Sequence, residues 1–336
     1  MDFEDFKAGS SQRLKRIQDE LRQHAHTTPH RHLYKQVLEA LDGTGLEAAI
    51  DACDGRTGKC GSIFCEGCCS RKIEQLRATL DSHFRQAYDD EDSIRANARY
   101  VTVLQGIVGV DFTSIITEHS AISAIQYSVD ELRKRLKRVK RIARDDYQQA
   151  LWMRGSIHLE MLNLSDWWAA ADFGAETAKH RTLRGFVGEG HIDSERQILV
   201  HCHLVVDIAG MSDKDFRKIW DRVFDDAPRQ VLSQRLYREI LRNGISHTHT
   251  LDDAWKGISR YAYNWGNNRL VFANNWGSGR NSEVMAALDD FRVQVMSDSG
   301  TESKLTIRDI RFLVMSYDAV SGKAHRGLSL SWQPKQ

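Results

Sequence analysis

The chain of 336 residues is long enough for two or three domains, or for one large domain with insertions. Hydrophobic residues make up 41% and charged residues 28%, a balance that is typical of soluble globular proteins. The net charge of +1 does not by itself indicate a nucleic-acid partner. No apolar run approaches the roughly 20 residues of a membrane span, and the acidic start lacks the apolar segment of a secretory signal. We therefore expect a cytoplasmic protein without a membrane partner.

The first segment, 1–72, is polar and rich in His, Cys and Gly, and we interpret it as a small N-terminal module. Five of the 6 cysteines fall between Cys53 and Cys69. A reducing compartment disfavours disulfides, so such a cluster indicates metal ligands. Four thiolates would form a closed structural zinc site, and we assign it to Cys53, Cys60, Cys65 and Cys68. The alternative is a loop of unliganded cysteines.

The next elements follow from the spacing of apolar residues. Residues 71–88 have helical spacing, and 99–110 are β-branched and apolar, which predicts a buried strand. A long helix is expected over 122–143, and a second strand over 151–162. The polar segment that follows, 163–196, interrupts the pattern.

The clearest strand of the chain is 198–208, followed by a helix over 212–224. An Asn-Gly pair predicts a hairpin within 231–250, and 252–263 should form a helix. The end, 305–332, is expected to add one or two strands. This order predicts an α+β fold in which helices cover an antiparallel sheet.

Two histidines lie two residues apart on the clearest predicted strand. Because side chains alternate along a strand, His201 and His203 should share one face, and Cys202 the other. Two neighbouring imidazoles bind one divalent metal ion well. The alternative is a pair of core histidines that donate to backbone carbonyls.

A carboxylate on the preceding predicted strand favours the metal interpretation. Glu160 should lie on the same face of that strand as His158. One carboxylate beside His201 and His203 makes an open site with three ligands and room for substrate oxygens. The alternative is a surface glutamate, since the sequence does not establish that the two strands are neighbours.

Two tyrosines near the end of a predicted helix supply a candidate nucleophile. Tyr261 and Tyr263 lie close to Lys256 and Arg260. A phenol, with a pKa near 10, is a poor nucleophile unless a metal polarises the target and cations stabilise the phenolate. The alternative is that both tyrosines are amphipathic packing residues.

The predicted long helix contains eight basic residues and one acid between Glu131 and Arg144. Such a concentration in a nearly neutral chain favours a surface that binds phosphates, although a solvated helix face is the alternative. The DNA-binding candidates are Arg133, Lys134, Lys137, Arg138, Lys140, Arg141 and Arg260.

Taken together, these segments resemble the plasmid rolling-circle replication initiators of the HUH endonuclease superfamily. The resemblance rests on the strand from Tyr100 to Leu104, the strand from Gly155 to Glu160, the motif His201-Cys-His203, and the pair Arg260-Tyr261. It spans about residues 99–265, and the N-terminal cysteines also occur in such initiators.

The resemblance implies a five-stranded antiparallel sheet flanked by helices in a nuclease domain over 73–265. A C-terminal extension, 266–336, would complete that domain or be appended to it. The implied activity is nicking of one strand of a plasmid origin, with later rejoining of the ends. The implied partners are single-stranded and duplex origin DNA, with a host helicase and polymerase.

The resemblance also implies roles for particular residues. His201, His203 and Glu160 would hold Mg or Mn, and Tyr261 would form a 5′-phosphotyrosine, with Tyr263 as the alternative nucleophile.

The chain departs from the family pattern at three places. Segment 163–196 looks like an insertion, Asn264 replaces a lysine that follows the tyrosine, and Gly257 replaces a glutamate that some initiators use to activate water.

Two other classes of protein remain open. A relaxase or a single-strand transposase uses the same chemistry, whereas a zinc-containing regulator of plasmid copy number would bind DNA without cleaving it. A nuclease requires the hydroxyl of Tyr261 to face the site formed by His201, His203 and Glu160.

Overall fold

The computed structural model describes residues 66–162, 164, 178–187, 196–226, 230–236, 239–242, 245–262, 307–321 and 328–332, together with residues 39, 42 and 53. Its centre is one sheet in the order β4-β1-β3-β2-β7, in which every pair of neighbours is antiparallel. The strands are β1 (Ala98–Val110), β2 (Trp152–Leu162), β3 (Arg196–Asp207), β4 (Val231–Arg235) and β7 (Leu328–Trp332). The α+β class with a five-stranded antiparallel sheet is thus confirmed.

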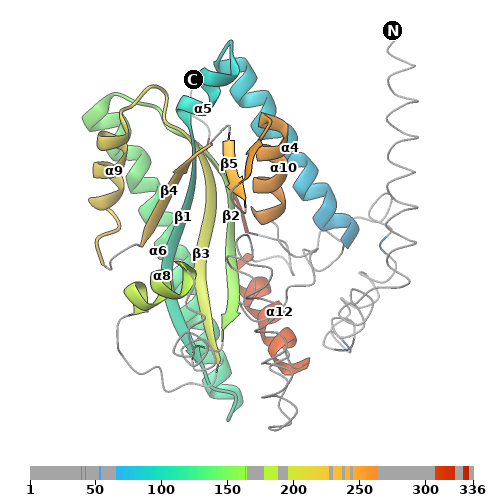
Figure 1. Ribbon diagram of the computed structural model, residues 1–336. Coiled ribbons are helices and arrows are strands. Elements are labelled where there is room, and N and C mark those ends of the chain that lie inside the picture. Colours follow the sequence, from blue (N-terminus) through green and yellow to red (C-terminus); the bar gives the residue numbers. More distant parts are fainter. Residues whose placement is uncertain are drawn as a thin grey trace.

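Three helices cover one face of the sheet, which we call the back face: α6 (Ile115–Tyr147), α9 (Asp213–Asp221) and α12 (Ile307–Ser321). Alternate residues of the strands, such as Val103 and Cys202, pack there against α6 residues such as Leu136. A capping box at Ser114 begins α6, and Gln148 ends it in the left-handed conformation at φ 55°. In Figure 1, α6 runs behind the sheet. This face carries the largest apolar core of the described residues.

The opposite, front face is covered at its two ends. At one end lie α4 (Glu66–Ala87), α5 (Glu91–Asn97) and α10 (Leu251–Ala262), with Phe84 and Trp255 packed near Val205. At the other end lies α8 (Ala178–Val187), whose Leu183 packs with Leu104 and Leu199 of the sheet. A polar stretch of the front face lies between these two apolar clusters.

Two expectations about elements are confirmed, but each range also contains an element that we did not expect. Within 231–250, β4 joins the edge of the main sheet, and the hairpin consists of β5 (Glu239–Arg242) and β6 (Ile245–Thr248). Within 305–332, a helix precedes a single strand, because Leu313 and Tyr317, buried and four residues apart, supply a helical stripe. Strand β7 pairs with β2, so the described part of the C-terminal extension completes the sheet.

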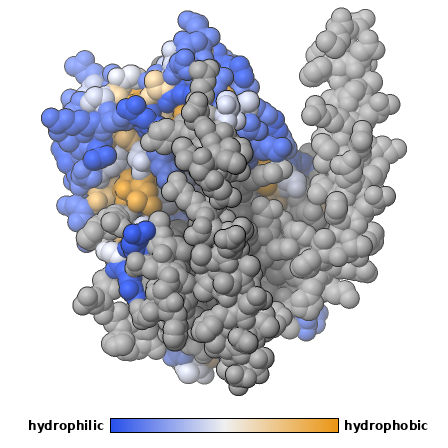
Figure 2. Space-filling view, in the orientation of Figure 1, coloured by the Kyte–Doolittle hydropathy of each residue, from blue (hydrophilic) through white to orange (hydrophobic). Residues whose placement is uncertain are grey.

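Most of the expected N-terminal module lies outside the described residues. Helix α4 begins at Glu66, within the range assigned to that module, and packs against α10 through a bidentate ion pair between Arg77 and Asp252. Of the segment 163–196, the structure describes Leu164, α8 and the first residue of β3. The described surface in Figure 2 is mostly hydrophilic over α9, α5 and α4. Among the described helices, none has the length and apolarity required to cross a membrane.

Candidate metal centre

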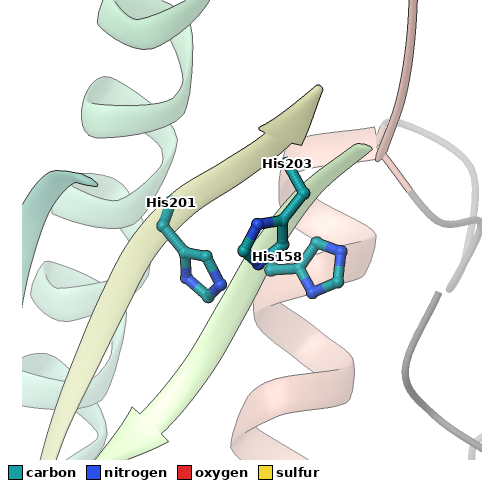
Figure 3. A group of neighbouring side chains, drawn as sticks. All are labelled: His158, His201 and His203. Carbon is teal, nitrogen blue, oxygen red and sulfur yellow. The ribbon is translucent and has the colours of Figure 1, made fainter. Parts of the chain in front are cut away.

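Strand pairing brings three histidines together on the front face. His158 of β2 lies directly across from His201 of β3, and His203 follows two residues later on the same side. One nitrogen from each ring lies within 4.8 Å of the others. Figure 3 shows the three imidazoles gathered on one side of the two strands. His201 and His203 are both only 2% exposed, so this cluster is a buried polar site between two apolar ones.

A close approach of the strands depends on Gly155. A Cβ atom added at this position would lie 1.9 Å from the carbonyl oxygen of His203. No side chain fits at that distance, so β2 or β3 would have to move. Gly155 therefore allows the pairing that aligns His158 with His201.

Hydrogen bonds orient two of the rings. The Thr102 hydroxyl lies 2.9 Å from Nδ1 of His203, and the Ser156 hydroxyl lies 2.8 Å from Nε2 of His158. Tyr100 stacks on His203, with ring centroids 5.8 Å apart and an interplanar angle of 10°. A hydrogen bond to one ring nitrogen fixes the orientation of the ring, as the outer partners of metal-binding histidines do.

Glu160 lies beside the histidines, with its Oε2 4.0 Å from Nε2 of His201. From the sequence we expected Glu160 as the third ligand, and the structure adds His158, which lies with His201 and His203 in a group whose potential ligand atoms are all within 4.8 Å of one another. The pairing explains this: His158 faces His201 across the strands, but Glu160 faces Leu199. The signal was present in the sequence, since His158 shares the face of Glu160.

The donor set decides which metals fit. Three imidazoles with a nearby carboxylate suit Mn, Zn, Co or Ni, and they leave coordination positions for other oxygens. Mg prefers oxygen ligands and retained water, so a site of three imidazoles fits it less well. Of the two metals that the resemblance implies, Mn fits these donor atoms better than Mg does.

Cys202 lies between the two histidines but faces away from them, as expected. It belongs to the apolar core under α6, and burial raises the pKa of its thiol. A neutral thiol on the back face cannot serve as a ligand to a metal bound on the front face.

The candidate nucleophile belongs to a helix on the same face as the histidines. Helix α10 includes Tyr261 in its last turn, and its Leu251 and Trp255 pack with Val205, which shares the face of His203. The side chain of Tyr261 and all of Tyr263 lie outside the described residues, as does the side chain of Arg260.

Two other tyrosines are poor nucleophiles. Burial raises the pKa of Tyr88, whose hydroxyl also donates to Asp207 at 2.6 Å. Burial likewise raises the pKa of Tyr317, whose hydroxyl accepts a hydrogen bond from the backbone N–H of Leu159. A phenol whose ionisation is opposed in this way does not readily supply a phenolate.

The structure describes two of the four cysteines assigned to zinc. The sulfur atoms of Cys53 and Cys68 are 3.6 Å apart. A disulfide bond requires about 2.0 Å, whereas two thiolates at about 2.3 Å from one tetrahedral zinc would be separated by about 3.8 Å. The spacing fits the zinc geometry. Cys60 and Cys65 lie outside the described residues.

The basic residues of α6 belong to the layer of helices that covers the back face, whereas the histidines lie on the front face of the sheet. Lys134, Lys137, Arg138 and Arg141 are exposed, whereas Arg133 and Lys140 are half-buried. The sequence alone did not indicate that the sheet separates these residues from the metal centre.

Comparison with known proteins does not identify a family for this chain. No family model, curated protein or solved structure matches this chain.

Proposed function

We propose that this protein is a metal-dependent, single-strand DNA nicking enzyme that initiates rolling-circle replication of a plasmid. The observation that carries the proposal is the convergence of His158, His201 and His203, with Glu160 4.0 Å from His201. Such a cluster of imidazoles suits a divalent metal that binds phosphate oxygens. The resemblance of the chain to the HUH initiators supplies the reaction.

The proposed chemistry is a transfer of one phosphodiester. A divalent metal in the histidine site would withdraw charge from a non-bridging phosphate oxygen. The hydroxyl oxygen of Tyr261 forms a bond to phosphorus and loses its proton, while the bond from phosphorus to the 3′ oxygen breaks. The departing 3′ oxygen takes up a proton, and the 5′ phosphate remains on the tyrosine. Because no bond energy is lost to water, a 3′ hydroxyl reverses the step and rejoins the strand.

The described residues around the site have supporting roles. Thr102 and Ser156 hold the rings of His203 and His158, and Tyr100 packs along one of them. The apolar clusters at either end fix the positions of β2 and β3 and reduce access of bulk water. Together these contacts preorganise the donors before DNA binds.

A covalent-adduct assay tests the proposal. Single-stranded oligonucleotides tiled across the DNA that encodes the protein are incubated with the full chain and Mn, then resolved on a denaturing gel. A protein–DNA band is expected, absent in Tyr261→Phe and in His201→Ala. Cys202→Ala, a substitution of a neighbouring residue that faces the back-face core, should retain the band.

If Tyr261→Phe forms the band and Tyr263→Phe does not, the nucleophile is Tyr263. Binding of origin DNA without any adduct would favour the copy-number regulator.

We also propose a structural zinc ion held by Cys53, Cys60, Cys65 and Cys68. The 3.6 Å separation of the sulfur atoms of Cys53 and Cys68 supports it. Elemental analysis of the purified protein should give about one zinc ion per chain, lost in Cys68→Ser and kept in Cys202→Ala. Equal zinc content in both variants would contradict the assignment.

A further inference from the structure

The solvent face of α6 carries a stripe of cations with an exposed aromatic residue. Lys134, Lys137, Arg138 and Arg141 recur every three or four residues and are all exposed, opposite the buried side of the helix. Tyr127, seven residues before Lys134, lies on the same side and is 70% exposed. From Tyr127 to Arg141 the stripe is about 21 Å long, at 1.5 Å per residue.

The charges of this stripe are largely uncompensated within the described residues. Arg133 pairs with Asp130, and Arg135 pairs with Glu131 and Asp226, but both arginines lie outside the stripe. Lys134 approaches Glu131 at 3.5 Å.

No described carboxylate lies within ion-pair distance of Lys137, Arg138 or Arg141. The pKa of Asp145 is lowered mainly by a hydrogen bond from Arg144, and the charge of Arg141 adds only a smaller electrostatic contribution. Cations three and four residues apart destabilise a helix unless an anion offsets them.

The stripe and the histidines lie on opposite sides of the sheet. The side of α6 away from the stripe, including Val129 and Leu136, packs on the back face with Cys202. His201 and His203 project from the front face of the same strand. A nucleotide at the histidines therefore cannot contact the stripe, because the sheet and α6 lie between them.

We propose that the solvent face of α6 binds the phosphate backbone of duplex DNA at a surface separate from the metal centre. This inference rests on the proposed function, which supplies DNA as the polyanion. Cations one helical turn apart can bind successive phosphate groups, and the exposed hydroxyl of Tyr127 can donate a hydrogen bond to a phosphate oxygen. Such contacts bind DNA without regard to its base sequence. The surface retains the duplex that flanks the origin, while the front face acts on the exposed single strand.

The experiment compares two doubly substituted proteins. Arg138→Gln/Arg141→Gln removes two of the four positive charges of the stripe. Arg85→Gln/Arg311→Gln removes two exposed arginines outside the stripe, Arg85 of α4, which pairs with Asp81, and Arg311 of α12. Fluorescence anisotropy measures the affinity of each full-length protein for a labelled 30-base-pair duplex of random sequence over a series of KCl concentrations. The adduct rate is measured in parallel with the shortest single strand that the wild type cleaves.

The stripe variant should bind the duplex more weakly, and its plot of log affinity against log salt should be shallower by about two. Its adduct rate on the short strand should stay within about two-fold of wild type, and its Tm should not fall, because substitution relieves repulsion. The control variant should match wild type in both assays. Arg138→Lys/Arg141→Lys should keep the wild-type salt dependence.

A salt dependence of the stripe variant equal to that of the control would overturn the inference. An equal loss of duplex binding and of adduct rate would also overturn it, because it would indicate one common surface. If the wild type forms no adduct, the proposed nicking function fails, and the duplex assay still decides whether the stripe binds DNA.

Discussion

The two faces of one sheet differ in chemistry although they share the same strands. Along β3, the side chains of Val200, Cys202 and Leu204 pack in the apolar core under α6. His201 and His203 lie on the opposite, front face, in the polar region between its two apolar clusters. The back face is closed by three helices, and the front face is covered only at its ends among the described residues. The comparison indicates that the back face supplies stability and leaves the front face free to hold groups that are costly to bury.

The largest expected effect on stability comes from the back face. Leu136→Ala removes a fully buried side chain from the core between α6 and the sheet. We expect the free energy of unfolding to fall by about 2–5 kcal/mol, with little change in Mn affinity. Urea denaturation and Mn titration followed by electron paramagnetic resonance measure the two quantities. A large loss of Mn affinity in folded protein would contradict the separation of the two faces.

A change at the contact between β2 and β3 should affect both faces. Gly155→Ala places a methyl group against the carbonyl of His203. We expect a loss of about 1–3 kcal/mol in stability together with weaker Mn binding, because His158 and His201 are no longer aligned across β2 and β3. Gly257→Ala, in the interior of α10 where an added Cβ meets no atom within 4 Å, is the control. It should raise stability by up to about 1 kcal/mol through helix propensity and leave Mn affinity unchanged. Wild-type Mn affinity in Gly155→Ala would show that the close approach does not position the site.

A smaller and purely local effect is expected at Thr102. Thr102→Val keeps the shape of the side chain and removes the hydroxyl 2.9 Å from Nδ1 of His203. Loss of a group that orients a metal-binding histidine typically lowers metal affinity by about 10–100-fold. The Mn titration should show this loss, while urea denaturation in EDTA stays near wild type. Thr102→Ser, which retains the hydroxyl, should restore the affinity.

The smallest expected effect is pH-dependent and lies at the edge of the sheet. Asp213 opens α9 and accepts hydrogen bonds from Arg99 of β1 and Arg235 of β4. Burial acts to raise the pKa of Asp213, but the two arginines outweigh it and the net shift is downward. A lowered pKa in the folded state means that the stabilisation exists above the unfolded value near 3.9 and is lost as the pH falls below it.

Asp213→Asn should therefore be less stable than wild type by about 1 kcal/mol at neutral pH, since the carboxylate is partly exposed. Urea denaturation should show the two proteins converging as the pH falls below about 4. A difference that stays constant down to pH 3 would show that the charge of Asp213 is not responsible.

Local patterns in the sequence were sufficient to predict most of the sheet. Alternating residues around His201 placed the histidines on one face and Cys202 on the other, as the structure confirms. The neighbour of each strand could not be predicted, because pairing depends on contacts between distant segments. For that reason we could not predict that His158 faces His201, or that β4 joins the edge of the main sheet apart from the neighbouring hairpin. The roles of Thr102 and Gly155 depend on distances across strands, which spacing along one chain does not contain.

The most direct test of the central claim is to locate the covalent bond to DNA. Wild-type protein is incubated with Mn and a cleavable single-stranded origin oligonucleotide, digested with trypsin and nuclease, and analysed by mass spectrometry. We expect the remaining nucleotide to be attached to Tyr261, and we expect no modified peptide from His201→Ala. Attachment to a tyrosine of the back-face layer, such as Tyr127 or Tyr317, would contradict it, as would an adduct that forms equally well in His201→Ala.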